Sequence, residues 1–314
     1  MTKKLLEGEL QLAAELLKQG ELVAFPTETV YGLGALVFNE EAIRKIFSVK
    51  GRPSDNPLIV HVADWEQIAL LVEEIPPLFH TLYERFFPGP LTVVMKKRPQ
   101  VPSIVSGGLD SVALRMPSHP LARKLISLCQ VPIVAPSANL SGRPSSTRAE
   151  HVLEDFDGKI AAVVDGGPTD FGIESTVVSL LGDSVTLLRE GAIAREDLEE
   201  ALGMRIAVAT KSEGGKVLSP GMKYRHYAPQ TPIRLFSSAQ QLLEYASPGK
   251  SMLLSREPFA LQGADHYVLC SKDFYSHLRH ADAQQYSEIL IFCDQLVQRN
   301  AALMNRINRS AGNS

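Results

Sequence analysis

Apolar residues in the first two hundred positions form two kinds of pattern, short continuous runs and repeats at helical spacing. The continuous runs predict buried strands at 22–25, 58–62, 91–95, 111–114, 131–135, 160–164 and 176–180. The helical repeats predict helices at 10–17, 39–47, 121–128, 148–156 and 195–202. Asn39 is placed to cap the second helix, and Gly20 directly follows the first. Strands that alternate with helices in this way indicate an α/β fold.

The pattern changes after residue 202. Residues 211–232 are rich in Gly, Ser, Pro and Lys without apolar periodicity, which is typical of a linker or a functional loop. Beyond them, strands are predicted at 233–236, 252–254, 267–270 and 289–292, with helices at 239–245 and 272–279 and a closing helix that follows the last strand and ends at about Ile307. This second region is a small, Rossmann-like α/β unit. It has no GxGxxG loop and therefore gives no case for NAD binding.

Length and charge narrow the possible partners. A chain of 314 residues is long enough for two domains. Its 32 Lys and Arg residues against 35 Asp and Glu give a net charge of −3, so nothing draws the whole chain to nucleic acid or to an anionic membrane. Any anion site must therefore be a local patch.

Cysteine use and hydropathy suggest where the protein works. Cys129, Cys270 and Cys293 lie far apart with no CxxC spacing, which argues against a zinc site or disulfides and fits a reducing compartment. No stretch approaches the roughly 18 apolar residues that a membrane span needs. We expect a cytoplasmic protein without membrane association.

Polar loops rich in Gly and Pro follow several predicted strands, where α/β sheets place their ligands. The loop 26–34 contains Thr27, Glu28, Thr29 and two glycines that allow close backbone approach to a ligand. It is equally compatible with a turn whose Thr hydroxyls bond their own backbone. This loop by itself leaves both interpretations open.

The loop 50–57 carries two cations around a glycine. The dipole of the preceding helix accounts for Lys50 but not for Arg52, whose guanidinium suits phosphate oxygens. Asn56 and His61 bracket one end of the strand that follows, which contains His61. A lone strand histidine is more often a core residue than a catalytic one, so His61 has both interpretations.

Four later loops add cations and hydroxyls. Arg115 ends an apolar strand, where it must reach solvent or an anion, since burying it unpaired would cost several kcal/mol. The loop 135–147 holds five hydroxyls with Asn139 and Arg143. Ser146 or Thr147 is predicted to cap the next helix, and the remaining hydroxyls suit phosphate or ribose oxygens. The loops 172–176 and 188–191 complete the set.

Several familiar catalytic motifs are absent from the sequence. It has no GxxxxGK[ST], HExxH or GxSxG motif, and no cysteine in a polar segment, so it offers no strong candidate for covalent catalysis. What the loops offer instead is a cradle for a polyanion, formed by Lys50, Arg52, Arg115, Arg143 and Arg189.

These motifs, taken in order, resemble the YrdC/Sua5 family of threonylcarbamoyl-AMP synthases, which act in t6A modification of tRNA. The family's KxR and SxN signatures appear as Lys50-Gly51-Arg52 and Ser137-Ala138-Asn139. The resemblance implies a YrdC-like catalytic domain with a twisted mixed sheet at 7–194 and a linker or lid at 195–231. It implies a small Rossmann-like C-terminal Sua5 domain at 232–314.

The resemblance also implies an activity and a site. The expected enzyme is a nucleotidyltransferase that makes threonylcarbamoyl-AMP and pyrophosphate from L-threonine, bicarbonate and ATP, with Lys50 and Arg52 as catalytic residues at the triphosphate. The implied ATP-binding residues are Lys50, Arg52, Asn56, Ser111, Ser137, Asn139, Ser145, Arg189 and Tyr224. The implied L-threonine-binding residues are Thr29, His61, Arg115, Ala135 and Ser175.

Cofactors and partners follow from the same resemblance. Mg²⁺ is expected with the triphosphate, bound through phosphate oxygens and water because no acidic pair is an obvious ligand. The segment Ser219–Pro229 is expected to act as a lid rather than a spacer. Possible macromolecular partners are tRNA and a threonylcarbamoyl transferase complex. Two alternatives stay open, an RNA-binding module and a carbamoyl-transfer module like that of hydrogenase-maturation proteins.

Overall fold

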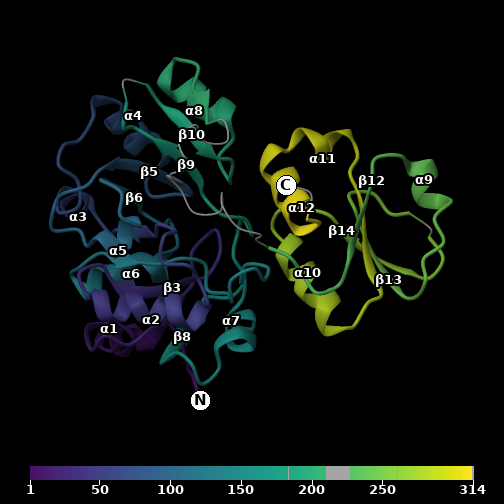
Figure 1. Ribbon diagram of the computed structural model, residues 1–314, viewed down its shortest axis with the longest axis horizontal. Coiled ribbons are helices and arrows are strands. Elements are labelled where there is room, and N and C mark those ends of the chain that lie inside the picture. The colour runs from purple at the N-terminus through teal and green to yellow at the C-terminus, as the bar shows by residue number, and fades with distance from the viewer. Residues whose placement is uncertain (183, 210–226, 260, 313–314) are drawn as a thin grey trace. The chain divides into compact units, whose positions relative to one another are not determined.

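The computed structural model describes residues 1–182, 184–209, 227–259 and 261–312 (Figure 1). The described residues form two compact units. The first comprises 1–141 and 146–209, and the second comprises 142–145 and 227–312. None of the helices within these ranges is both long and apolar enough to cross a membrane.

The first unit is built on one mixed sheet. Among the described residues the sheet has eleven strands, in the order β1-β8-β2-β3-β7-β4-β6-β5-β9-β10-β11. Their bounds are β1 Lys3–Leu5, β2 Val23–Phe25, β3 Gly32–Leu36, β4 Ile59–His61, β5 Leu91–Lys96, β6 Ser111–Arg115, β7 Ile133–Val134, β8 Ala162–Val164, β9 Thr176–Ser179, β10 Thr186–Arg189 and β11 Ala207–Val208. Parallel pairs such as β4 with β6 adjoin antiparallel pairs such as β5 with β6. The predicted mixed α/β fold is confirmed.

Helices cover both faces of this sheet. They are α1 Leu10–Lys18, α2 Glu40–Lys50, α3 Trp65–Ala69, α4 Pro77–Phe86, α5 Ser103–Ser106, α6 Pro120–Cys129, α7 Ala149–Phe156 and α8 Arg195–Leu202, with a short 3₁₀ helix at Glu7–Glu9. Along β2, Val23 and Phe25 pack in one apolar cluster with α1 and α6, whereas Ala24 packs in the cluster that contains α2 and α7. Alternate residues of one strand thus reach both layers.

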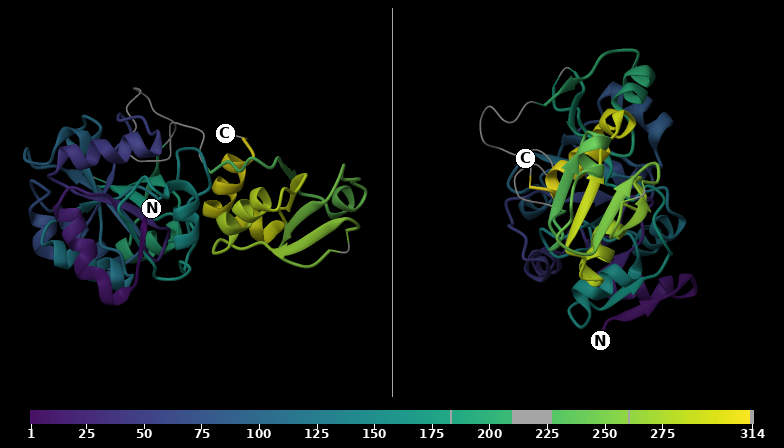
Figure 2. Two further views of the ribbon diagram at one scale, coloured as in Figure 1. Left: turned by 90° about the horizontal axis from the view of Figure 1, so that it is seen from below. Right: turned by 90° about the vertical axis from the view of Figure 1, so that its right-hand side faces the viewer.

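The second unit has a wholly parallel sheet in the order β12-β15-β13-β14 (Figure 2). Its strands are β12 Ile233–Phe236, β13 Ser251–Ser255, β14 Ala264–Val268 and β15 Glu288–Phe292. The helices α10 Phe274–Ala283, α11 Gln295–Arg299 and α12 Ala301–Ser310 lie on one side of this sheet, and α9 Ala239–Leu243 lies on the other (Figure 1). A parallel sheet covered on both faces is what the Rossmann-like pattern predicts.

The N-cap predicted from the sequence is correct for one helix and wrong for another. Asn39 caps α2 as predicted, because its side chain accepts a 3.0 Å hydrogen bond from the Ala42 amide. The predicted cap of α7 is wrong: the N-cap residue is Arg148, and it makes no side-chain capping bond. Ser146 Oγ instead donates to the Ala138 carbonyl at 2.6 Å, and the Thr147 hydroxyl lies 3.4 Å from His151 Nδ1. Both hydroxyls are thus engaged elsewhere, that of Ser146 with the preceding loop and that of Thr147 with His151 of α7 itself.

Three boundaries differ from the predicted pattern. The last part of the predicted loop 26–34 is strand β3, which pairs antiparallel with β2. The strand predicted at 267–270 begins earlier, as β14 at Ala264. The closing helix is divided at Asn300, whose side chain caps α12 by accepting from the Leu303 amide. The predicted linker 211–232 lies outside the described residues up to 226.

Candidate active site

Two neighbouring strands bring the first pair of predicted residues together. β4 and β6 are parallel, and His61 and Arg115 are register partners at their last positions. Side chains at paired positions of adjacent strands project to the same face. The sequence predicted Arg115 at the end of one apolar strand and His61 within another, and the pairing of those strands makes them neighbours.

Lys50 is the last residue of α2 and is only 3% exposed. Its ammonium donates to the carbonyl of Ser137 at 2.6 Å and to that of Asn139 at 2.5 Å. The KxR and SxN signatures, 87 residues apart in sequence, therefore meet through this side chain. A solvated lysine that only balances the helix dipole would not be buried in this way.

Ser137 and Arg52 make hydrogen bonds within their own segments. Ser137 Oγ donates to Asn139 Oδ1 at 2.6 Å. Arg52 Nη2 donates to the Pro57 carbonyl at 3.0 Å. Asn56 is buried, and its Oδ1 accepts no hydrogen bond from the described residues. The loops around Lys50 are thus fixed by their own side chains.

Arg115 lies in a second buried polar cluster. Its Nη2 is 2.7 Å from Glu28 Oε1, its Nη1 donates to Thr29 Oγ1 at 2.8 Å, and its Nε donates to the Gly89 carbonyl at 3.2 Å. Arg115 is 4% and Glu28 1% exposed. The cation that the sequence expects to meet an anion thus already lies beside a carboxylate of the same unit.

The charge of Glu28 depends on that neighbour. Burial alone would raise the pKa of its carboxyl, but the charge and close contact of Arg115, with smaller contributions from the amides of Ser118 and Glu28 itself, lower the pKa below its usual range. Glu28 is therefore ionised at neutral pH. The pair is a buried carboxylate and a buried guanidinium side by side.

His61 is buried and neutral. Burial, followed by the charge of Arg115, lowers its pKa to about 3. Its ring makes an edge contact with Phe25, with centroids 6.1 Å apart, and its Nδ1 accepts or donates no hydrogen bond among the described residues. Packing explains the ring, but it leaves a polar nitrogen without a partner beside Arg115.

The glycines of β3 serve packing here. A Cβ at Gly34 would lie 2.9 Å from the Phe25 ring, and one at Gly32 would lie 3.0 Å from the Ala135 Cβ. The Phe25 ring passes over this part of the strand to reach His61. For Gly34, the space that the sequence suggested for a ligand is filled by an aromatic side chain.

Loop 26–31 links the two clusters. Thr29 accepts from Arg115, while the Tyr31 carbonyl accepts from the Ala138 amide at 2.7 Å. Gly32 also forms an isolated antiparallel bridge with Ser137. The loop therefore contacts both the Arg115 cluster and the SxN segment.

Ser175 and Arg189 form a third group. Arg189 Nη2 donates to the Ser175 carbonyl at 2.8 Å and to its hydroxyl at 3.2 Å, and that hydroxyl lies 2.8 Å from Thr92 Oγ1. Gly191 allows this approach, because a Cβ there would lie 2.3 Å from the backbone of Ser175. Thr92 is a contact that the sequence analysis missed.

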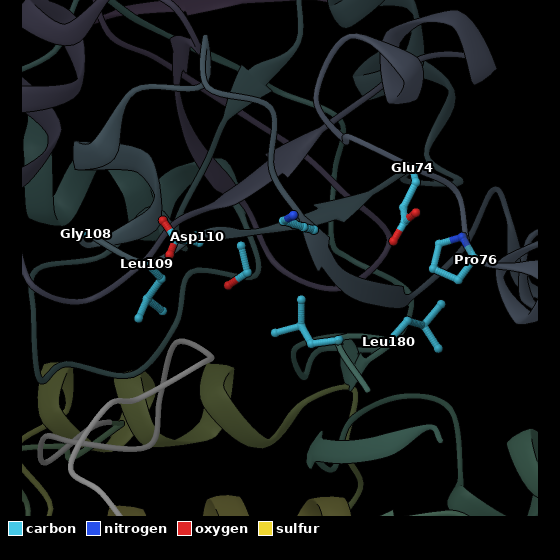
Figure 3. Close-up of a pocket in the computed structure, with 9 residues that line it drawn as sticks. Glu74, Pro76, Gly108, Leu109, Asp110 and Leu180 are labelled. Atoms are coloured by element: carbon cyan, nitrogen blue, oxygen red, sulfur yellow. The ribbon is translucent and has the colours of Figure 1, made fainter. Parts of the chain in front are cut away.

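The other predicted residues in the described part of the chain belong to further strands and loops. Ser111 begins β6 and lines a cavity of about 360 Å³ together with Glu74, Asp110 and Leu180 (Figure 3). Ala135 is buried, and its amide donates to the Ile59 carbonyl at 3.0 Å. Ser145, fully buried, and Arg143 belong to the second unit. Tyr224 and residues 219–226 of the expected lid lie outside the described residues.

Glu28 is the residue to which the sequence analysis gave no role. It stood inside the first loop and its acidic type was visible, but nothing in the spacing linked it to an arginine 87 positions later. Across the described ranges, no group of three or more His, Cys, Asp or Glu side chains could hold a metal ion. The site is therefore one of buried cations, hydroxyls and one carboxylate.

Comparison with known proteins gives matches along the whole chain. Residues 15–191 match a family model described as telomere recombination, of the Sua5/YciO/YrdC type, and residues 193–312 match that of the threonylcarbamoyl-AMP synthase C-terminal domain. Threonylcarbamoyl-AMP synthase of Bacillus subtilis is 42% identical, covering 98% of this chain and 94% of the relative. That of Pyrococcus abyssi is 41% identical, covering 98% and 95%.

Solved structures agree with these matches. The crystal structure of P. abyssi Sua5 complexed with L-threonine has a TM-score of 0.91 at 39% identity and covers 100% of this chain and 98% of that one. E. coli YciO, at 19% identity and a TM-score of 0.57, covers 63% of this chain and all of its own, and supports the fold alone. The resemblance inferred from the KxR and SxN motifs is confirmed: the chain belongs to the Sua5/YrdC family of threonylcarbamoyl-AMP synthases.

Proposed function

We propose that this protein is an L-threonylcarbamoyladenylate synthase. It joins L-threonine, bicarbonate and ATP into threonylcarbamoyl-AMP, pyrophosphate and water, and supplies the activated group for t6A at adenosine 37 of ANN-decoding tRNAs. The observation that carries the proposal is the meeting of Lys50 with Ser137 and Asn139 in a unit that also holds the buried Glu28–Arg115 pair. One group is suited to phosphates and the other to an amino acid.

The chemistry requires positioning more than a nucleophilic side chain. The amine of threonine combines with bicarbonate to a carbamate and releases water, and a carbamate oxygen then attacks the α-phosphorus of ATP while pyrophosphate leaves. Displacement at phosphorus is accelerated by alignment and by neutralisation of the developing charge. Lys50 and Arg52 supply that charge in this proposal.

The remaining roles follow the two clusters. Asn56, Ser111, Ser137, Asn139, Ser145, Arg189 and Tyr224 are proposed to bind ATP; Thr29, His61, Arg115, Ala135 and Ser175 are proposed to bind L-threonine. The neutral His61, with an unpartnered Nδ1, can accept a hydrogen bond from a substrate hydroxyl or amine. Arg115 can give its remaining N–H groups to the substrate carboxylate.

The metal, the domain organisation and the partners are also proposals. Because the described residues lack a cluster of metal ligands, Mg²⁺ would enter with ATP and stay bound through phosphate oxygens and water. The catalytic domain spans 7–194, the linker 195–231 and the C-terminal domain 232–314. The proposed setting is the cytoplasm, where a threonylcarbamoyl transferase complex and tRNA would receive the product.

The test is to mix the purified protein with the three substrates and to look for threonylcarbamoyl-AMP by mass spectrometry. Pyrophosphate release should require both threonine and bicarbonate, and it should proceed without RNA. Lys50→Ala and Arg52→Ala should each lower this release by about 100-fold or more. Unchanged turnover in both variants would remove the triphosphate assignment, and tRNA binding without any adenylate would favour the RNA-binding alternative.

A further inference from the structure

The Glu28 carboxylate is almost fully buried yet poorly matched by hydrogen bonds. It is 1% exposed, and neither oxygen accepts a well-aligned hydrogen bond from any described residue, although Arg115 Nη2 is 2.7 Å from Oε1. Nearby amides favour its charge without such alignment. A buried carboxylate has about four acceptor positions, and folded proteins seldom leave them unused. Glu28 therefore has capacity to accept from a ligand.

Arg115 has matching donor capacity. A guanidinium has five N–H groups. The Nε group and one Nη1 group are bonded to Gly89 and Thr29, while Nη2 makes no well-aligned hydrogen bond in the described part of the chain. A buried carboxylate and a buried guanidinium thus lie side by side, each with unused hydrogen-bonding positions. His61 Nδ1, from the neighbouring strand, is a third unpartnered atom.

We infer that Glu28 and Arg115 together recognise the zwitterion of an α-amino acid, with Glu28 accepting from its α-ammonium group and Arg115 donating to its α-carboxylate. The inference rests on the proposed function and makes Glu28 a specificity-determining residue of the same site. The Glu28–Arg115 pair has no net charge, and it therefore complements a zwitterion, which also has no net charge.

A comparison with other small carboxylates shows how the Glu28 carboxylate makes the site selective. Arg115 alone would attract any small carboxylate, such as a hydroxy acid. With Glu28 beside it, a ligand without an ammonium group brings a second anion to one guanidinium and leaves the Glu28 oxygens unbonded. Sites that bury such groups reject ligands that cannot pair with them. The pair therefore selects amino acids over hydroxy acids.

Titration calorimetry on the full-length wild-type protein with ATP tests this first. The ligands are L-threonine, the analogue with a hydroxyl in place of the α-amine (2,3-dihydroxybutanoate), and threoninol, which lacks the carboxylate. Both analogues should bind at least about 100-fold more weakly than L-threonine. A hydroxy acid that binds as tightly as threonine would overturn the inference without any variant.

The variant Glu28→Gln tests the residue itself. Affinity for L-threonine should fall about 10- to 100-fold, while affinity for 2,3-dihydroxybutanoate stays level or rises, and ATP affinity is unchanged. Glu28→Asp should keep most of the discrimination. A purely structural role would weaken both ligands alike, and that result would overturn the inference.

A matched control is Glu288→Gln, which alters another buried glutamate, in the second unit, bonded to Tyr245 and Ser247. It should leave the preference for threonine over the hydroxy acid unchanged. If the wild-type protein binds no L-threonine at all, the proposed function fails, and this inference fails with it. If threonine binds and Glu28→Gln keeps the full preference, only the inference fails.

Discussion

Lys50 and Arg115 are both buried cations of the first unit, but they are held in different ways. Lys50 is bonded to two backbone carbonyls of the SxN segment, whereas Arg115 lies beside the carboxylate of Glu28. Loss of Lys50 would release a loop, and loss of Arg115 would leave a charge buried without its counterpart. The same sequence signal, a cation in a polar loop or at a strand end, thus corresponds to two different physical situations.

The largest effect is expected for Arg115→Gln. Removing one member of a buried ion pair typically costs about 3–5 kcal/mol, because the other charge stays in the interior. Urea denaturation should show this loss in the free energy of unfolding. The double variant Glu28→Gln/Arg115→Gln, with no buried charge left, should recover part of it. If the double variant is as unstable as the sum of the two single variants, the ion pair is not the cause.

Lys50→Met should have a smaller effect on stability. It leaves the carbonyls of Ser137 and Asn139 without their charged donor, at a cost of about 1–3 kcal/mol. ATP affinity should fall with it, because the SxN loop is released, while threonine affinity should change less. Lys45→Met, on the same helix and 42% exposed, is the control: it loses only surface contacts with Glu21 and the Gly20 carbonyl, so stability should fall by no more than about 0.5 kcal/mol and ATP affinity should not change. Equal losses in the two variants would refute the assignment to Lys50.

Because His61 is neutral in the folded protein, the free energy of unfolding should fall by about 1 kcal/mol at mildly acidic pH. Its pKa is lowered from 6.5 to about 3 in the folded protein, so below pH 6.5 the unfolded chain binds a proton that the folded chain does not. The contribution is present in full above pH 6.5 and is lost progressively as the pH falls toward 3. Between pH 7.5 and 5.5, the wild type should lose about 1 kcal/mol more than His61→Gln.

The comparison of these two proteins isolates His61 from other histidines with a lowered pKa. Partial burial also lowers the pKa of His119 and of His277, and those residues contribute equally to both slopes. Identical slopes for the wild type and His61→Gln would show that folding does not lower the pKa of His61.

The smallest effect is expected for an exposed ion pair. Arg44 and Glu40 lie 3.0 Å apart on α2, with side chains 66% and 53% exposed. Arg44→Gln should cost only about 0.2–0.5 kcal/mol, since water screens such pairs. If Arg44→Gln lowered the free energy of unfolding as much as Arg115→Gln, burial would not be what distinguishes the two ion pairs.

Helices with strong local signals were predicted close to their observed bounds. The apolar stripe and the Asn39 cap defined the beginning of α2, and the stripe at 195–202 matches α8. Strand β3 was missed because its glycines resemble a turn, although Gly34 is required by the Phe25 ring across the strand and Gly32 by the side chain of Ala135. The predicted cap of α7 was wrong because the Ser146 hydroxyl bonds the Ala138 carbonyl and the Thr147 hydroxyl lies against His151 of α7 itself.

Residue type and order along the chain were sufficient to indicate an α/β protein with buried strands, loops rich in cations and hydroxyls, and the KxR and SxN motifs of its family. These features depend on local periodicity and composition, which one segment carries by itself. Only the tertiary structure decided that Lys50 meets Ser137 and Asn139, and that Glu28 meets Arg115. Such contacts join residues 87 or 89 positions apart, and they depend on strand pairing and burial, which no local pattern encodes.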